Sequence, residues 1–177
     1  MNKKRGEKGQ VWIETVIYLL IAFVMIGLVL SFARPKIEEL RDKAIIEQSL
    51  EVMKDIENVF LTIGSPGNKR LIEIGIRKGS LIIDSSTEEI YFEIESNYVY
   101  TEPGVEVEVG NIIATTIERG RNNLVTLKRD YSSEYNIRYK NEDEIKTFSK
   151  ASNPYKVFIS NAGEDVTQRT IINFDLE

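Results

Sequence analysis

An uninterrupted apolar run near the start of the chain constrains its fold more than any other feature. From Thr15 to Ala33 the sequence TVIYLLIAFVMIGLVLSFA contains 19 residues without a charge. At about 1.5 Å of rise per residue, a helix of this length crosses the ~30 Å hydrocarbon core of a bilayer. The run therefore predicts a transmembrane helix.

A secretory signal peptide is the alternative interpretation of the run. The apolar part of such a peptide has about 7 to 15 residues and precedes a cleavage site of small residues. The sequence SFA at 31–33 fits such a site, and cleavage there would release a secreted domain that begins at Arg34. The length of the run favours the membrane span. Basic residues flank the run on both sides, so the positive-inside rule gives no orientation.

Composition restricts the chemistry that the chain can perform. Its 177 residues, 42% hydrophobic and 29% charged, fit one globular domain and one accessory element. The absence of Cys and His excludes disulfides, thiol nucleophiles, imidazole bases and the usual zinc ligands. The first nine residues carry a net positive charge, so the rest of the chain is more acidic than the net charge of -5 suggests. This acidity argues against a nucleic-acid partner.

A short motif precedes the apolar run. In KGQVWIE, a lysine and a glycine, Lys8 and Gly9, stand before Gln10, and Glu14 is the fifth residue after the glycine. This arrangement resembles the class III signal peptide of type IV pilins, and the short basic leader resembles the archaeal members in particular. The resemblance covers about residues 1–35.

The resemblance implies a course of processing and assembly. In that family a membrane peptidase cuts after the glycine and leaves the apolar helix on the mature protein. A leader of residues 1–9 would thus be removed, with Lys8, Gly9 and Gln10 as processing residues. The implied partners are further copies of the chain, the prepilin peptidase, a pilus assembly ATPase, membrane platform proteins and the membrane. The precursor would be a single-pass membrane protein and the mature form part of an extracellular filament.

Glu14 is the residue that a plain membrane anchor explains least well. An ionisable group in a membrane segment indicates a functional site when its partner can be named. Cleavage would give Gln10 a cationic α-amino group, which a carboxylate on a neighbouring subunit attracts strongly at low dielectric. We expect this pair to set the axial register between helices. In the alternative, Glu14 lies at headgroup level beside Trp12, an interfacial aromatic.

The rest of the helical region divides at a proline. Gly27 and Ser31 are four residues apart and share a helix face, so they are candidate assembly residues where another helix approaches closely. Pro35 would bend or interrupt the helix, which gives an assembly helix over 10–35. Apolar spacings of three and four then predict an amphipathic stalk helix over 36–63 that packs on the following domain. Its stripe contains Ile46, Leu50, Met53, Ile56 or Glu57, Phe60 and Ile63.

Residues 64–177 form the predicted head domain. Gly64–Gly67 is expected to stop the helix, and apolar and polar residues then alternate in the manner of half-buried strands. Six such segments are at 71–76, 89–95, 105–109, 124–128, 135–139 and 155–160, and three more buried or terminal ones at 81–84, 111–117 and 169–174. The predicted fold class is α+β, a long hydrophobic-to-amphipathic helix followed by an antiparallel β-sandwich or barrel.

The head offers few residues for catalysis. Glu93 and Glu95 share one strand face and Glu106 and Glu108 another, but the apolar residues between them indicate a solvated outer face. The acidic run 142–144 lacks the spacing of a calcium loop. The tyrosines are expected to fill strands rather than to form an adhesive surface. We predict no catalytic residue, no metal, no cofactor and no enzymatic activity.

The predicted function is that of a structural subunit in a type IV pilus-like surface filament that serves attachment. A minor pilin or pseudopilin is one alternative. A single-pass anchored protein whose extracellular β-domain acts as a receptor or envelope component is another, and the secreted domain is the last. Archaellum proteins share the leader type but generally lack a glutamate at the position of Glu14.

Overall fold

The computed structural model describes the backbone of residues 7–177 and the side chains from Trp12 onward. Leader residues 1–6 lie outside the described residues. The chain separates into two compact units, Met1–Leu40 and Arg41–Glu177. A long N-terminal helix is followed by β-sheets, so the predicted α+β class is confirmed.

Helix α1 spans Glu7–Thr62 and contains Pro35. Pro35 therefore does not interrupt the helix, although its missing N–H removes one bond of the helical ladder. The predicted stop is confirmed, because Gly64 follows α1 with a φ of 72°, which glycine adopts without steric cost. Side chains satisfy the last carbonyls: Asn68 Nδ2 donates to Ile63 O at 2.8 Å and Arg70 Nη2 to Thr62 O at 3.0 Å.

The described part of the second unit contains two sheets. The four-stranded sheet has the order β1-β9-β10-β7 and the six-stranded sheet the order β4-β5-β6-β3-β2-β8. All pairings are antiparallel except that of β10 with β7, which is parallel. The strands are β1 (Lys69–Ile74), β2 (Ser80–Asp84), β3 (Glu89–Ser96), β4 (Glu106–Val109), β5 (Ile112–Arg119), β6 (Asn122–Asp130), β7 (Tyr135–Tyr139), β8 (Ile145–Ser149), β9 (Tyr155–Glu164) and β10 (Thr170–Leu176).

Each of the nine predicted strands has a counterpart. The exception among the described strands is β8, which the sequence did not predict. Only Phe148 of β8 is buried, so the strand has too little apolar character to show a period of two. The head consists of two open sheets with free edges rather than a closed barrel.

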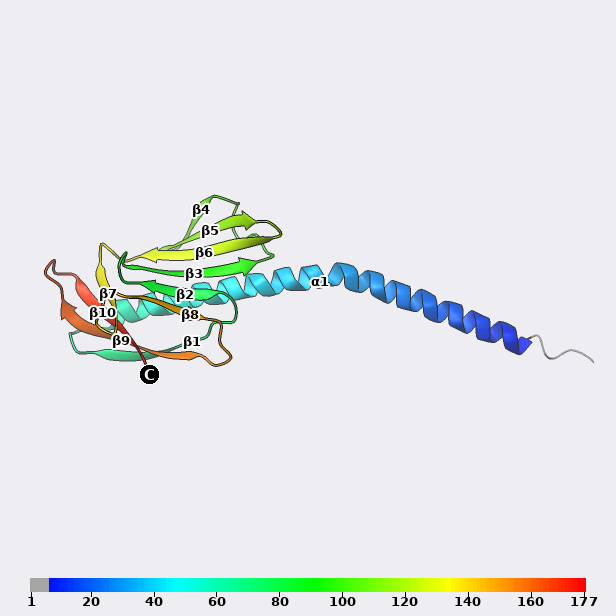
Figure 1. Cartoon of the computed structure of the whole chain (residues 1–177), viewed down its shortest axis with the longest axis horizontal. Helices are drawn as coiled ribbons and strands as arrows, with labels where there is room; N and C mark the ends of the chain where they lie inside the picture. The colour runs from blue at the N-terminus through cyan, green and yellow to red at the C-terminus, as the bar shows by residue number, and fades with distance from the viewer. Residues whose placement is uncertain (1–6) are drawn as a thin grey trace, which may run out of the picture. The chain divides into compact units, whose positions relative to one another are not determined.

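The end of α1 forms the centre of the core. All six positions of the predicted stripe are buried, with Ile56 rather than Glu57 as its fourth member. The ring of Phe60 contacts Phe174 of β10 and Tyr131, which follows β6, at centroid distances of 5.8 and 4.9 Å. The helix thus packs on both sheets, and Figure 1 shows the cyan part of α1 with β3 and β6 above it and β1 and β9 below it.

A buried carboxylate, that of Asp42, fixes the start of the second unit. Asp42 is 4% exposed and accepts a hydrogen bond from Lys78 before β2. Its other oxygen accepts from the backbone and side-chain amides of Asn97, after β3, at 2.6 and 3.1 Å. The β2–β3 hairpin is therefore attached to α1 at both of its ends. Sequence analysis did not single out Asp42, although it lies one turn before Ile46 on the extension of the apolar stripe.

We predict that Asp42→Ala lowers the free energy of unfolding by about 2 kcal/mol, because it removes a buried charged acceptor that holds Lys78 and Asn97. Denaturant titration of the second unit measures this. Glu51→Ala is the matched control: Glu51 is exposed and pairs with Lys54 at 3.8 Å. The control should change stability by less than about 0.5 kcal/mol. Equal effects of the two substitutions would contradict the role of Asp42.

Candidate functional site

The first unit presents an apolar helix surface. Large hydrophobic side chains are exposed along it, from 37% at Val16 to 78% at Phe32. Among the described residues, α1 is the one helix long and apolar enough to cross a membrane, by length and composition. Burial of one such side chain is worth about 1.5–3 kcal/mol. A surface with this many exposed apolar side chains is unfavourable in water and is stabilised by lipid or by other helices.

Glu14 lies near the start of this surface. Its side chain is exposed, and Trp12 beside it is 70% exposed. No hydrogen bond or ion pair joins its carboxylate to the side chains described from Trp12 onward. A carboxylate placed in lipid needs a cationic or hydrogen-bonding partner.

The predicted processing residues lie at the beginning of α1. The backbone of Lys8, Gly9 and Gln10 is helical, whereas their side chains lie outside the described residues. The Gly9–Gln10 peptide bond is in the first turn, where backbone N–H groups have no helical partner and helix ends fray. A protease can therefore extend this segment at low cost. Gln10 also lies one turn, about 6 Å, before Glu14 along the axis.

Gly27 and Ser31 mark a shallow depression in the helix surface. A Cβ atom added at Gly27 would meet no heavy atom within 4 Å. Together with Leu30 and Arg34, these two residues line the depression. The missing side chain at Gly27 leaves the helix backbone accessible here.

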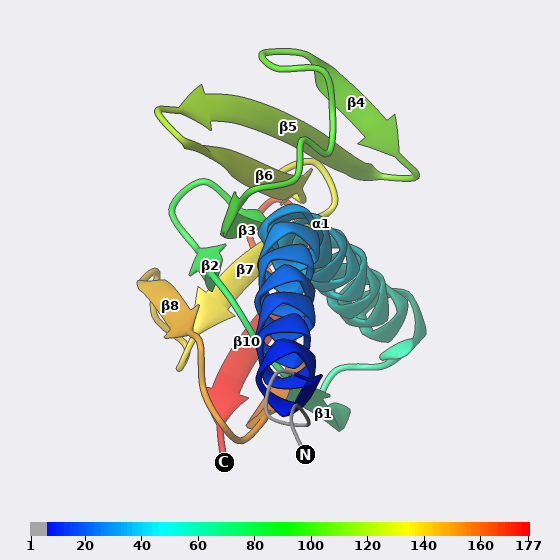
Figure 2. The same ribbon diagram turned by 90° about the vertical axis from the view of Figure 1, so that its right-hand side faces the viewer.

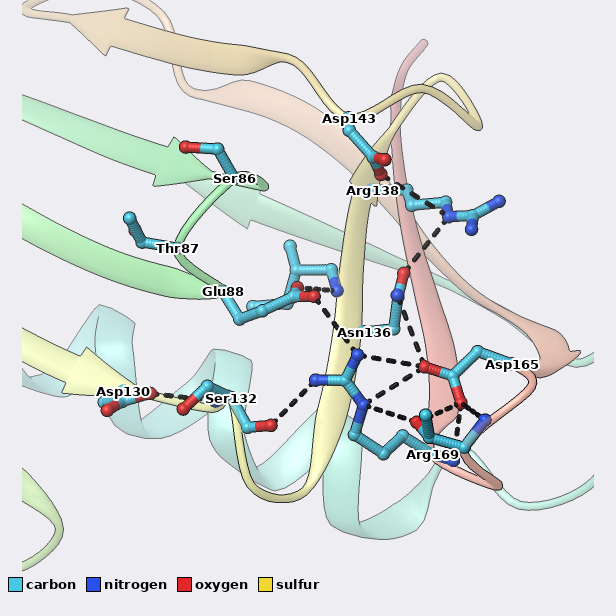
Figure 3. Close-up of polar contacts among 12 residues, drawn as sticks. Ser86, Thr87, Glu88, Asp130, Ser132, Asn136, Arg138, Asp143, Asp165 and Arg169 are labelled. Carbon is cyan, nitrogen blue, oxygen red and sulfur yellow. Dashed lines mark hydrogen bonds and ion pairs between the residues drawn. The ribbon is translucent and has the colours of Figure 1, made fainter.

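The head contains a polar cluster that joins three turns (Figure 3). Arg169, before β10, donates to Ser132 O between β6 and β7 at 2.7 Å. Its guanidinium also lies 3.0 Å from Asp165 and 3.7 Å from Glu88, the residue before β3. Glu88 in turn accepts a hydrogen bond from the backbone N–H of Ile137 in β7. The cluster thus connects the two sheets.

The two carboxyl groups of this cluster have shifted acidities. Burial raises the pKa of Glu88, although the Ile137 N–H and the Arg169 charge oppose the shift. Hydrogen bonds from Thr167 and Arg169 hold the pKa of Asp165 well below its usual range. Because this pKa is depressed, Asp165 contributes to stability at neutral pH, and the contribution is lost as the pH falls through it. The groups satisfy one another, which is the arrangement of a structural tether.

The remaining candidates in the head are surface or core residues. Glu93, Glu95, Glu106 and Glu108 are exposed, as predicted for a solvated face. Among the described residues no three His, Cys, Asp or Glu side chains converge as metal ligands. Tyrosines contribute to the core as expected, with Tyr131 and Tyr139 buried. The best candidate for a functional element is therefore the exposed apolar helix with Glu14 near its start.

Compared with known protein families, with curated protein sequences and with solved structures, the chain has no match in any of the three sets.

Proposed function

We propose that this chain is a type IV pilin-like subunit of archaeal type, cut after Gly9 and polymerised through the helix 10–33 into a surface filament. One observation carries the proposal. An exposed apolar helix, joined to a folded β-domain, has a carboxylate one turn after the residue that cleavage would make the N-terminus. A simple anchor needs the apolar surface but has no use for Glu14.

Assembly in this proposal is an exchange of surroundings. The subunit waits in the membrane with its apolar side chains in lipid, and in the filament the same side chains contact neighbouring helices. Lipid tails are as apolar as Leu, so the transfer depends on packing and on polar contacts between helices. The small residues Gly27 and Ser31 favour close packing, and Glu14 supplies the polar contact.

The charge pair determines how subunits are staggered. The amine of Gln10 on one subunit pairs with Glu14 on its neighbour. Because these positions are four residues apart in one helix, the two subunits are displaced by about 6 Å along the axis. Pairing also removes an uncompensated charge from the membrane, which favours the polymer over the stored monomer. Repetition of this unsymmetrical contact gives an open helical filament rather than a ring.

The head has a different role in this proposal. It forms the outer part of the filament and serves surface attachment, and it has no catalytic task. Maturation requires a prepilin peptidase, and assembly requires an ATPase with its membrane platform proteins. A minor pilin or pseudopilin would use the same helix and the same cleavage.

Substitution of Gly9 tests the proposal. A Gly9→Leu chain should remain in the membrane at its full length and form no filaments, because a bulky side chain beside the scissile bond blocks the peptidase. Immunoblots of membrane fractions and electron microscopy of the cell surface measure the two outcomes. The control is Gly6→Leu, a glycine of the same leader away from the cut, which should mature normally. Normal cleavage and filaments in Gly9→Leu cells would contradict the leader assignment.

A further inference from the structure

Strands β1 and β4 each lie at the edge of a sheet, and their net charges have opposite signs. Strand β1 ends the four-stranded sheet, and β4 ends the six-stranded sheet. An edge strand presents unpaired N–H and C=O groups to which another strand can bond. In Figure 2, β4 lies at the outer margin of the head, and β1 lies at its opposite end beside the end of α1.

Strand β4 alternates strictly between glutamate and valine, and among its residues only Val109, next to the turn, is partly buried against the core. Val105 is 43% exposed and Val107 is 40% exposed. A two-residue turn at Gly110 and Asn111 joins β4 to β5, with Val109 opposite Ile112. In such a hairpin the closing pair is hydrogen-bonded, and every second residue from it bonds to the partner strand. The backbone groups of Glu106 and Glu108 therefore point toward the free edge.

Strand β1 borders a groove. Val52 and Val59 of α1 and Ile72 of β1 contribute to its lining, and its volume is about 390 Å³. These three side chains are only partly buried and pack against the core. Because residues of α1 and β1 line this groove together, a further strand beside β1 would lay alternate side chains toward the helix.

The charges of the two edges are complementary. Strand β1 starts with Lys69 and Arg70, and β4 carries Glu106 and Glu108. Lys69 Nζ lies 3.9 Å from the ring centroid of Phe158, which holds the cation on the outer face of the sheet. Like charges directly opposite each other are destabilising, so β4 repels a second β4, whereas β4 and β1 attract each other.

We propose that β4 of one copy pairs antiparallel with β1 of a second copy, with Glu108 opposite Lys69. In this register Val107 of β4 stands opposite Arg70, and Val105, the residue before β4, stands opposite Ile72, so both valines lie on the groove side of β1. Glu73 faces Gly104 and meets no glutamate. The contact joins two different edges, so it repeats from copy to copy without closing.

A strand of four residues forms few hydrogen bonds, so this pairing is weak between free heads. It rests on the proposed function to the extent that a filament holds the heads close together. Tethering through the apolar helices raises the effective concentration of one edge near the other. The pairing would then connect the heads into a continuous outer layer.

Cysteine cross-linking tests the pairing, since the natural chain contains no cysteine. The full chain with Lys69→Cys and Glu108→Cys is expressed in its own cells, which are treated with a short bis-maleimide. A ladder of covalent multimers is expected. The matched control joins Glu108→Cys to Thr147→Cys on β8, a free edge of the six-stranded sheet that also carries a lysine, Lys146. Multimers no more abundant than in this control would overturn the proposal.

Charge exchange provides a second readout. Lys69→Glu and Glu108→Lys, each introduced alone into the cysteine-free chain, should release the heads from one another and increase shedding of filaments by mild shear severalfold. The double exchange should restore resistance to shear. Shear resistance unchanged by both single substitutions, or unrestored by the double exchange, would contradict the pairing.

Electron microscopy of the same cells separates this proposal from the proposed function. Filaments without the multimer ladder overturn the edge pairing and leave the filament proposal in place. A ladder on cells that lack filaments supports the edge pairing and contradicts the filament proposal.

Discussion

A Glu14→Gln subunit is expected to insert into the membrane and to be cut after Gly9, yet to form few or no filaments. Insertion and cleavage do not need the carboxylate. Glutamine is less costly than glutamate in lipid, so the substitution stabilises the stored monomer. It also removes the contact that sets the register between neighbouring helices. Both effects lower the amount of polymer.

This experiment needs cells in which the variant is the only copy, because wild-type neighbours would carry it into filaments. Immunoblots report cleavage, and electron microscopy reports filament number and length. Glu38→Gln is the matched control, an exposed glutamate of α1 beyond the apolar run, and it should leave assembly unchanged. Wild-type filaments formed by Glu14→Gln subunits would contradict the pairing and would favour Glu14 as a headgroup-level residue of an anchor.

Removal of the end of α1 is expected to abolish cooperative folding of the head. A chain that starts at Lys36 keeps the buried stripe, and one that starts at Gly64 loses all six of its residues, from Ile46 to Ile63. Truncation of a single buried Ile, Leu or Met to Ala costs about 2–5 kcal/mol. The combined cost of losing several such residues exceeds the free energy of unfolding of a typical domain, about 5–15 kcal/mol.

Thermal unfolding followed by circular dichroism compares the two chains. The chain from Lys36 should be soluble and melt in one transition, and the chain from Gly64 should show no cooperative transition. A third chain that starts at Arg41, the first residue of the second unit, is the control and should be as stable as the chain from Lys36. Equal melting temperatures for the chains from Lys36 and Gly64 would show that the stripe does not stabilise the head.

The sequence predicted the elements whose signal is local. The spacing from Ile46 to Ile63 identifies the buried face of α1, because a helix repeats its faces every three to four residues. Gly64 identifies the end of the helix, since glycine adopts a positive φ at low cost. Valine and glutamate alternate in β4, although only Val109 of that strand is partly buried.

Features that depend on distant parts of the chain were not predictable in this way. The parallel pairing of β10 with β7 joins segments that are far apart in sequence. The partners of Asp42, Lys78 and Asn97, are 36 and 55 residues away, so only the fold brings them together. The tether at Arg169 likewise draws on three separate turns.

The candidate site shows the same division. Glu14, Gly27 and Ser31 are exposed on one helix, and the apolar residues around them are exposed as well. Their partners in the proposed function belong to other copies of the chain, which neither the sequence nor a single folded copy contains.

The intact mass of the surface-associated protein tests the central claim most directly. Our account predicts an N-terminus at Gln10, either as a free amine or as the cyclised form that glutamine can adopt. The cyclised form would retain the cut but remove the cation that Glu14 needs, so the mass also decides between these two ends. An N-terminus at Met1 would indicate a membrane-anchored β-domain, one at Arg34 would indicate a secreted domain, and either result would contradict the account.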